Sequence, residues 1–140
     1  MKLNKSQRLE LRQKFGGRCA YCGCELGDKF HADHVEAIYR ETEIVPRHKR
    51  KDPLKFEIRQ TGKSEKQHLD ALENLYPACV PCNLFKSVFS VEQFRKEITQ
   101  QVERARAYSV NFRTAERFGL VQEVVKPVVF WFEVYIGEAK

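Results

Sequence analysis

Four of the five cysteines fall into two pairs with the same spacing, Cys19-x-x-Cys22 and Cys79-x-x-Cys82. This spacing lets both thiolates of a pair turn toward one zinc ion at about 2.3 Å, and two such pairs complete a tetrahedral shell. Four thiolates leave no open position, so we expect a structural zinc site. Its binding free energy would supplement the modest core of a 140-residue chain. Cys24 is left over and is interpreted as a non-ligand.

A second cluster lies in the stretch FHADHVEA, where His31, Asp33 and His34 fall within four consecutive residues. Such side chains could bind a metal, act as an acid or base, or lie in a polar turn. Alternation along a strand would place His31 and Asp33 on one face and His34 on the other. Alternation alone therefore favours His31 and Asp33 as a metal-binding pair.

The combination CAYCG, HADHV and ENLYPACVPCNLFKS resembles the HNH endonucleases, also called ββα-metal or His-Me finger nucleases. It is most similar to their zinc-containing branch, in which two Cys-x-x-Cys pairs flank the motif. The resemblance covers about residues 12–90 and leaves residues 91–140 outside it. It implies an α+β fold in which a β-hairpin and a following helix hold one divalent ion. We expect residues 1–140 to form a single HNH endonuclease domain, with 91–140 as a C-terminal extension.

The resemblance also implies roles for individual side chains. His34 would be the general base, and Asp33 and Asn83 would bind a catalytic Mg²⁺ or Mn²⁺. Asn74 would tie a loop together and help to orient the base, and Lys86 would face phosphate. Asp33 and His34 can act on one phosphate only if the strand bends or ends at His34. His31 is then reduced to a neighbour of the site.

The residue types suit the hydrolysis of DNA phosphodiester bonds, which in this family leaves a 5′-phosphate and a 3′-hydroxyl. The oxygen atoms of Asp33 and Asn83 are hard ligands that leave most of an octahedral Mg²⁺ shell open. The imidazole of His34, with an unperturbed pKa of about 6.5, is mostly neutral at cellular pH and can accept a proton. Asn83 and Lys86 are three residues apart on the expected helix and share one face.

Between His34 and Asn74 lie 39 residues, more than a minimal HNH hairpin needs. Residues 39–53, in which Pro46 and Pro53 surround a basic run, predict an exposed loop. We expect this loop to lie against the nucleic-acid backbone; the alternative is an ordinary solvated surface loop. The predicted phosphate contacts are Arg47, Lys49, Arg50 and Lys51.

The remaining segments predict flanking elements around this core. Residues 6–15 indicate an N-terminal helix. Ser90 followed by Gln93 matches a capping box, and apolar residues at steps of three and four extend that helix to about Tyr108. Residues 111–120 predict a short helix, and residues 126–136 predict a β-strand that completes the core.

The uneven charge suggests a surface that binds a polyanion, and the alternative is charge on an ordinary solvated surface. The formal net charge is +6, and residues 1–18 carry six Lys or Arg against one Glu. The resemblance to HNH endonucleases makes double-stranded DNA the expected partner. No apolar run has the length of a membrane span and no signal peptide is evident, so we expect no membrane partner and a cytoplasmic location, in a bacterial or phage-infected cell.

Two other functions stay open at this point. One is a zinc-stabilised DNA-binding module that has lost cleavage, and the other is an RNA-directed nuclease. The oligomeric state is also open, because the edge of the predicted strand at residues 126–136 could join two copies into a homodimer or complete the core of a monomer.

Overall fold

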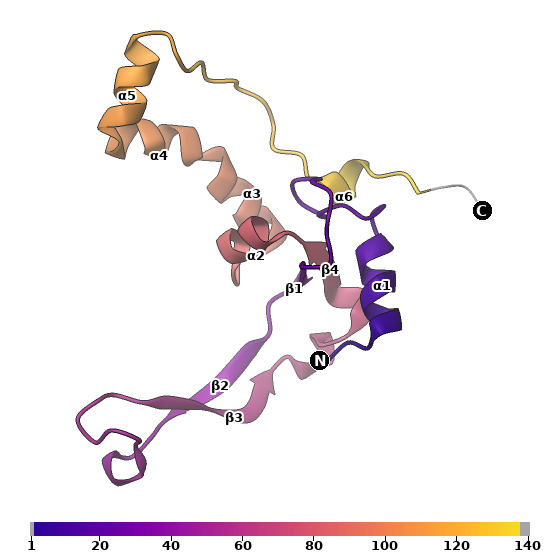
Figure 1. The fold of residues 1–140 in the computed structure, drawn as a ribbon, viewed down its shortest axis with the longest axis vertical. Helices are drawn as coiled ribbons and strands as arrows, with labels where there is room; N and C mark the ends of the chain where they lie inside the picture. The colour runs from indigo at the N-terminus through magenta and orange to yellow at the C-terminus, as the bar shows by residue number, and fades with distance from the viewer. Residues whose placement is uncertain (1, 138–140) are drawn as a thin grey trace.

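The computed structural model describes residues 2–137, which form an α+β structure of short helices and small antiparallel sheets (Figure 1). Single 3₁₀ turns at Arg47–Lys49, Gln67–Leu69 and Leu72–Asn74 join some of the elements. In chain order the helices and strands are α1 (Lys5–Gln13), β1 (His31–His34), β2 (Tyr39–Ile44), β3 (Ile58–Glu65), β4 (Leu75–Ala78), α2 (Val80–Lys86), α3 (Val91–Thr99), α4 (Gln101–Tyr108), α5 (Val110–Arg117) and α6 (Trp131–Val134).

The centre of the fold is the antiparallel pair β1 and β4. The pair runs from His31 opposite Ala78 to His34 opposite Leu75. β1 ends at His34, as the predicted roles of Asp33 and His34 require. α2 begins directly after β4, with Cys79 as its N-cap residue. β4 therefore leads directly into α2, and the end of β1 at His34 lies opposite Leu75 at the start of β4.

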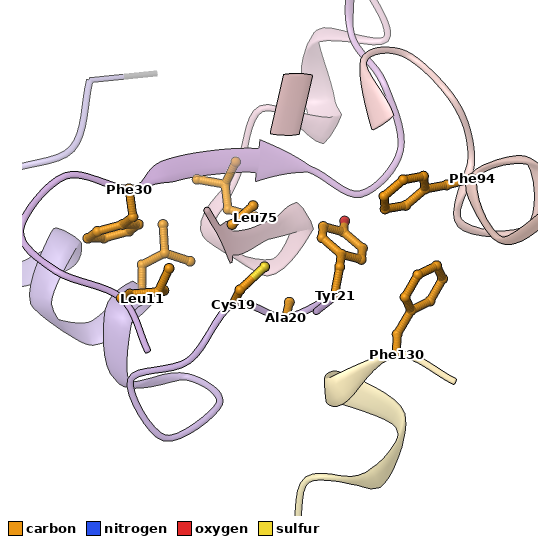
Figure 2. Close-up of a cluster of buried hydrophobic side chains, with 10 residues drawn as sticks. Leu11, Cys19, Ala20, Tyr21, Phe30, Leu75, Phe94 and Phe130 are labelled. Carbon is orange, nitrogen blue, oxygen red and sulfur yellow. The ribbon is translucent and has the colours of Figure 1, made fainter. Parts of the chain in front are cut away.

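The hydrophobic core joins segments that are far apart in the sequence. Figure 2 shows Tyr21 from the first cysteine turn next to both Phe94 of α3 and Phe130 of the C-terminal segment. Both phenylalanine rings meet Tyr21 edge-on with centroids 5.3 Å away, and they stack on each other at 5.3 Å. Aromatic pairs at these separations add to the free energy gained by burial alone. The remaining buried members are Leu11, Cys19, Ala20, Leu26, Phe30, Leu75 and Ala78.

α1 packs beside this core and is capped as a helix from Asn4. The Asn4 side chain accepts a hydrogen bond from the backbone N–H of Gln7, and the Gln7 side-chain oxygen accepts one from the backbone N–H of Asn4, which completes a capping box. Two arginines of α1, Arg8 and Arg12, donate to the backbone carbonyls of Phe30 and Leu26. These bonds hold the segment that leads into β1.

β2 and β3 form a two-stranded ribbon that projects away from the core (Figure 1). The prediction of an irregular loop for residues 39–53 is therefore wrong over Tyr39–Ile44. Every residue of β2 is exposed, so the segment lacks the alternation of apolar and polar residues that marks a strand in a sequence. The ribbon is held by its backbone ladder, and only its tip encloses a buried side chain, Val45.

The helices after residue 90 follow the predicted pattern with one break. The capping box of Ser90 and Gln93 is present at the start of α3. The single helix expected to about Tyr108 is divided at Gln100 into α3 and α4. The hydroxyl of Thr99 donates to the carbonyl of Arg95, a local bond that competes with regular helix geometry. α4 and α5 contain no fully buried residue.

The prediction of a strand at residues 126–136 is wrong, although the segment does complete the core. It contains one short helix, α6, preceded by an extended stretch. Its backbone makes two bonds to the first cysteine turn, from Trp131 N–H to the carbonyl of Tyr21 and from Phe132 N–H to that of Ala20. Packing of Phe130 thus decides the conformation more than β-propensity does.

Among residues 2–137, none of the helices has the length and apolar character needed to cross a membrane.

Candidate functional site

The four paired cysteines come together at one point. Their Sγ atoms all lie within 4.8 Å of one another, and those of Cys22 and Cys79 are 3.7 Å apart. Ligands about 2.3 Å from a tetrahedral zinc ion are separated by about 3.8 Å. This group could therefore hold a metal ion such as zinc, as its spacing predicts. The set consists of Cys19, Cys22, Cys79 and Cys82.

Backbone bonds shape both cysteine pairs. The first pair lies in a turn closed by a bond from Gly23 N–H to the carbonyl of Cys19, with Gly23 at φ +77°. A bond from Ala20 N–H to the carbonyl of Pro77 ties this turn to β4. The second pair begins at the N-terminus of α2. A hydrogen bond from Cys82 lowers the pKa of the Cys19 thiol to about 4, which favours the thiolate that binds metal.

Cys24 is not one of the four clustered cysteines. Its backbone carbonyl accepts a hydrogen bond of 2.8 Å from Cys19 N–H, so it supports the turn through the main chain. This position agrees with its interpretation as a non-ligand.

A cavity of about 200 Å³ lies at the end of β1, where β1 faces α2. Its lining includes Asp33 and His34 from β1, Asn83 from α2 and Arg40 from the start of β2. The two proposed metal ligands and the proposed base therefore share one cavity. His31 is exposed and is not among the residues that line it.

Asp33 is buried at the base of this cavity, with 4% of its surface exposed. Its Oδ2 atom accepts a hydrogen bond of 2.5 Å from the Tyr21 hydroxyl and lies 3.1 Å from Lys86 Nζ. Burial raises the pKa of the Asp33 carboxyl, and the contacts with Tyr21 and Lys86 partly offset that rise. Burial beside Asp33 also raises the pKa of Tyr21, which keeps the phenol protonated as a donor.

Lys86 does not face the solvent, so the prediction that it faces phosphate is wrong in this structure. Its side chain is fully buried, and Nζ donates to the carbonyl of His34 at 3.0 Å and pairs with Asp33. Lys86 shares a helix face with Asn83, as their spacing predicts. That face packs on β1, so the Lys86 side chain, which is longer than that of Asn83, ends beneath the cavity.

His34 is held at one ring nitrogen. Its Nε2 lies 2.9 Å from Asp70 Oδ1, and about a quarter of each side chain is exposed. A carboxylate at Nε2 favours the tautomer with its proton on that nitrogen, which leaves Nδ1 as the acceptor. The pairing orients the ring at the edge of the cavity.

No family model, curated protein or solved structure matches this chain. The site is therefore interpreted from its own geometry.

Asn74 ties the loop after β1 to the segment before β4. Its side-chain amide donates to the carbonyls of Glu36 and Leu69, and its side-chain oxygen accepts from Glu36 N–H. Its backbone carbonyl accepts from Val35 N–H. Asn74 does not line the cavity, so its part is to position the loop that follows His34.

The four basic residues predicted to contact phosphate lie at the tip of the β2–β3 ribbon. Arg47, Lys49 and Lys51 are exposed. Arg50 instead turns inward and donates to the carbonyls of Val45 and Lys55. The prediction that Arg50 contacts phosphate is thus not supported by its orientation, because its guanidinium caps the tip of the ribbon.

Three residues of the site were not identified from the sequence. Tyr21 and Asp70 contact Asp33 and His34, and Arg40 lines the cavity. Tyr21 lies between the first two cysteines, and Asp70 is 36 positions from its partner. Neither their residue type nor their spacing predicts these contacts, because the partners come from separate segments that only the fold brings together.

A larger cavity of about 570 Å³ lies between the α3–α4 junction and residues 123–129, away from these groups. Its lining is mostly aliphatic, and its one carboxylate, Glu123, pairs with Arg106. Since it contains no set of metal ligands, the smaller cavity is the candidate site.

Proposed function

We propose that the protein is a metal-dependent endonuclease that hydrolyses DNA phosphodiester bonds. The observation that carries this proposal is the meeting of Asp33, His34 and Asn83 in one cavity. The cavity lies at an antiparallel strand pair followed directly by a helix, beside a cluster of four cysteines. This arrangement supports the HNH resemblance seen in the sequence.

The residues present fit a catalytic Mg²⁺ or Mn²⁺. Asp33 and Asn83 offer a carboxylate and an amide oxygen, which suit hard divalent cations. The closer contacts of Tyr21 and Lys86 both fall on Oδ2 of Asp33, so Oδ1 is the better placed ligand atom. A bound ion would supply Lewis-acid stabilisation of the phosphoryl oxygens and of the leaving oxygen.

The chain's own groups then account for the proton transfer. Neutral His34 accepts a proton from the attacking water, and the hydroxyl oxygen bonds to phosphorus. The bond from phosphorus to the 3′-oxygen breaks, and the leaving 3′-oxygen takes a proton from a solvent water. This cleavage leaves a 5′-phosphate and a 3′-hydroxyl. Asp70 holds the imidazole in place through Nε2. Arg40, at the wall of the cavity, takes the phosphate-binding role that was first assigned to Lys86.

The substrate class follows from charge and shape. The ribbon projects beyond the cavity and carries Arg47, Lys49 and Lys51 exposed at its tip. These residues can neutralise phosphates of a duplex that extends from the cavity along the ribbon. Double-stranded DNA is therefore the proposed substrate, and structural zinc in the cysteine cluster is the proposed second cofactor.

One observation favours a second function, that of a zinc-stabilised DNA-binding module. The buried pair of Lys86 and Asp33 already balances the charge of the carboxylate that a divalent ion would use. A protein that only binds DNA would have this pair as a structural feature.

The nicking of supercoiled plasmid separates the two. Zinc-loaded protein is incubated with plasmid in the presence of Mg²⁺, of Mn²⁺, or of no added divalent ion. We expect nicked or linear plasmid only with the added metals. Retarded migration of DNA without any strand break, under all three conditions, would leave the binding module as the function.

A further inference from the structure

The β2–β3 ribbon has two chemically different faces. Residues opposite each other in an antiparallel pair share a face, and this places Thr42 with Gln60 and Glu43 with Arg59. The register shifts between Arg40 and Thr42, where three residues of β3 lie opposite one of β2, and Gly62 in that bulge has φ +87°. The step from Arg40 to Thr42 is two residues and that from Gln60 to Ser64 is four. Both steps are even, so Arg40 and Ser64 lie on the same face as Thr42 and Gln60 despite the bulge.

One face has only neutral polar, aliphatic and cationic side chains, and we name it the reading face. The opposite face contains the carboxylates Glu43 and Glu65, and alternation along β2 places Glu41 there as well; Glu43 pairs with Arg59 at 2.5 Å. Only the reading face therefore suits contact with a polyanion along its whole length. The reading face consists of Arg40, Thr42, Ile44, Ile58, Gln60 and Ser64.

We propose that the reading face enters the major groove of duplex DNA and recognises its base sequence. This inference rests on the proposed nuclease function, because the position of the recognised bases is given relative to the cut. Strands about 4.8 Å apart form a ribbon that a major groove about 12 Å wide admits. Every residue of β2 is exposed, so the rest of the protein does not cover this strand and DNA can reach it.

Arg40 connects the reading face with the proposed cleavage site. It is the first member of that face and also lines the cavity with Asp33 and His34. Ile44 lies four residues farther along β2, or about 13 Å at about 3.3 Å per residue. With base pairs spaced about 3.4 Å apart, the recognised bases fall within about five base pairs of the cut.

The side chains on this face match the edges of bases in the major groove. Gln60 can make two hydrogen bonds to adenine, and Thr42 can donate to or accept from a base edge. Ile44 and Ile58, more than half exposed, offer apolar contact with the methyl group of thymine. Duplex RNA is excluded as the target of this face, because its major groove is too deep and narrow for side chains to read.

The test is selection from a pool of duplex oligonucleotides with a randomised central region of about 14 base pairs, chosen to exceed one turn of DNA. Binding is carried out with zinc-loaded protein and no other divalent ion. The variant Thr42→Ala/Gln60→Ala removes two side chains of the reading face. The variant Glu43→Ala/Arg59→Ala is the matched control, because it removes the neighbouring pair from the opposite face without changing net charge.

We expect the wild type and the control to enrich one common sequence, and the reading-face variant to lose about five- to one-hundredfold of that preference. Affinity for unselected DNA should be similar for all three proteins. An unenriched pool from a protein that does cut plasmid, or an unchanged preference in the reading-face variant, would overturn the proposal. Enrichment by a protein that never cuts would instead refute the nuclease and leave the reading face in place.

Discussion

Lys86 Nζ lies 3.1 Å from Asp33 Oδ2, and both side chains are buried between α2 and β1. This ion pair joins the helix that supplies Asn83 to the strand that supplies His34. Because Lys86 also donates to the backbone carbonyl of His34, it fixes the end of the strand at the residue proposed as the base. Lys86, which the sequence predicted to face the substrate, thus has a structural role beneath the site.

Replacing Lys86 should therefore destabilise the protein. Lys86→Met leaves the Asp33 carboxylate buried without its partner, which typically costs about 3–5 kcal/mol in the free energy of unfolding. Urea unfolding of zinc-loaded protein measures this cost. Lys96→Met, an exposed position on α3, is the control and should change stability little. Equal stability of Lys86→Met and wild type would show that Lys86 lies outside the core in solution.

The hydrogen bond from Tyr21 should control the pH at which Asp33 binds metal. It stabilises the carboxylate and so lowers the pKa of Asp33 against the larger effect of burial. Tyr21→Phe removes the donor, so the pKa of Asp33 rises further and its carboxylate forms only at higher pH. As the pH is lowered, the Mn²⁺ affinity of Tyr21→Phe should begin to decline at a higher pH than that of the wild type. Calorimetry across the acidic range measures this difference. A Tyr21→Phe profile that coincides with the wild type would contradict this role.

Asp70 should act as a positioning residue for His34. Asp70→Asn loses the charge that fixes the imidazole tautomer, and outer partners of this kind typically contribute about 10–100-fold to activity. We expect kcat for plasmid nicking to decrease by that order, with DNA affinity unchanged. Asp52→Asn, on the distant ribbon tip, is the charge-matched control. DNA affinity that stays at the wild-type level separates this positioning role from a general loss of folding.

The cysteine cluster predicts one zinc ion per chain and a clear difference between two cysteines. Cys79→Ser removes one of the four clustered thiols, so zinc affinity and stability should both decrease markedly. Cys24→Ser should retain one zinc and near wild-type stability, because Cys24 supports the turn through its carbonyl. Metal analysis of the purified proteins gives the stoichiometry. Loss of zinc in Cys24→Ser would mean that this cysteine is a ligand.

The sequence predicts those parts of the site that depend on local spacing. The cysteine pairs and the capping box at Ser90 are each set by residues close together in the chain, and the structure confirms both features. The end of the strand at His34, which the structure also has, was expected only from the roles that the HNH resemblance implies. The partners Tyr21 and Asp70 depend on which strands pair, and no local pattern reports that.

Two elements were predicted wrongly because local preference and tertiary context disagree. Residues 39–44 form a strand although both faces are exposed, so no hydrophobic alternation marks them. Residues 126–136 have strong β-propensity, but Phe130 fills the core and only two backbone bonds to the first cysteine turn are available, at Tyr21 and Ala20. β-propensity produces a strand only where a partner strand is present.

The most direct measurement of the central claim is plasmid nicking by wild type and His34→Ala, with DNA binding followed in parallel. We predict metal-dependent nicking by the wild type. In His34→Ala, nicking should decrease by about 10²–10⁴-fold, the usual contribution of a general base, while DNA affinity is retained. Equal nicking by the two proteins, or no nicking by the wild type with Mg²⁺ or Mn²⁺ despite DNA binding, would contradict the assignment of His34 and the function proposed for this site.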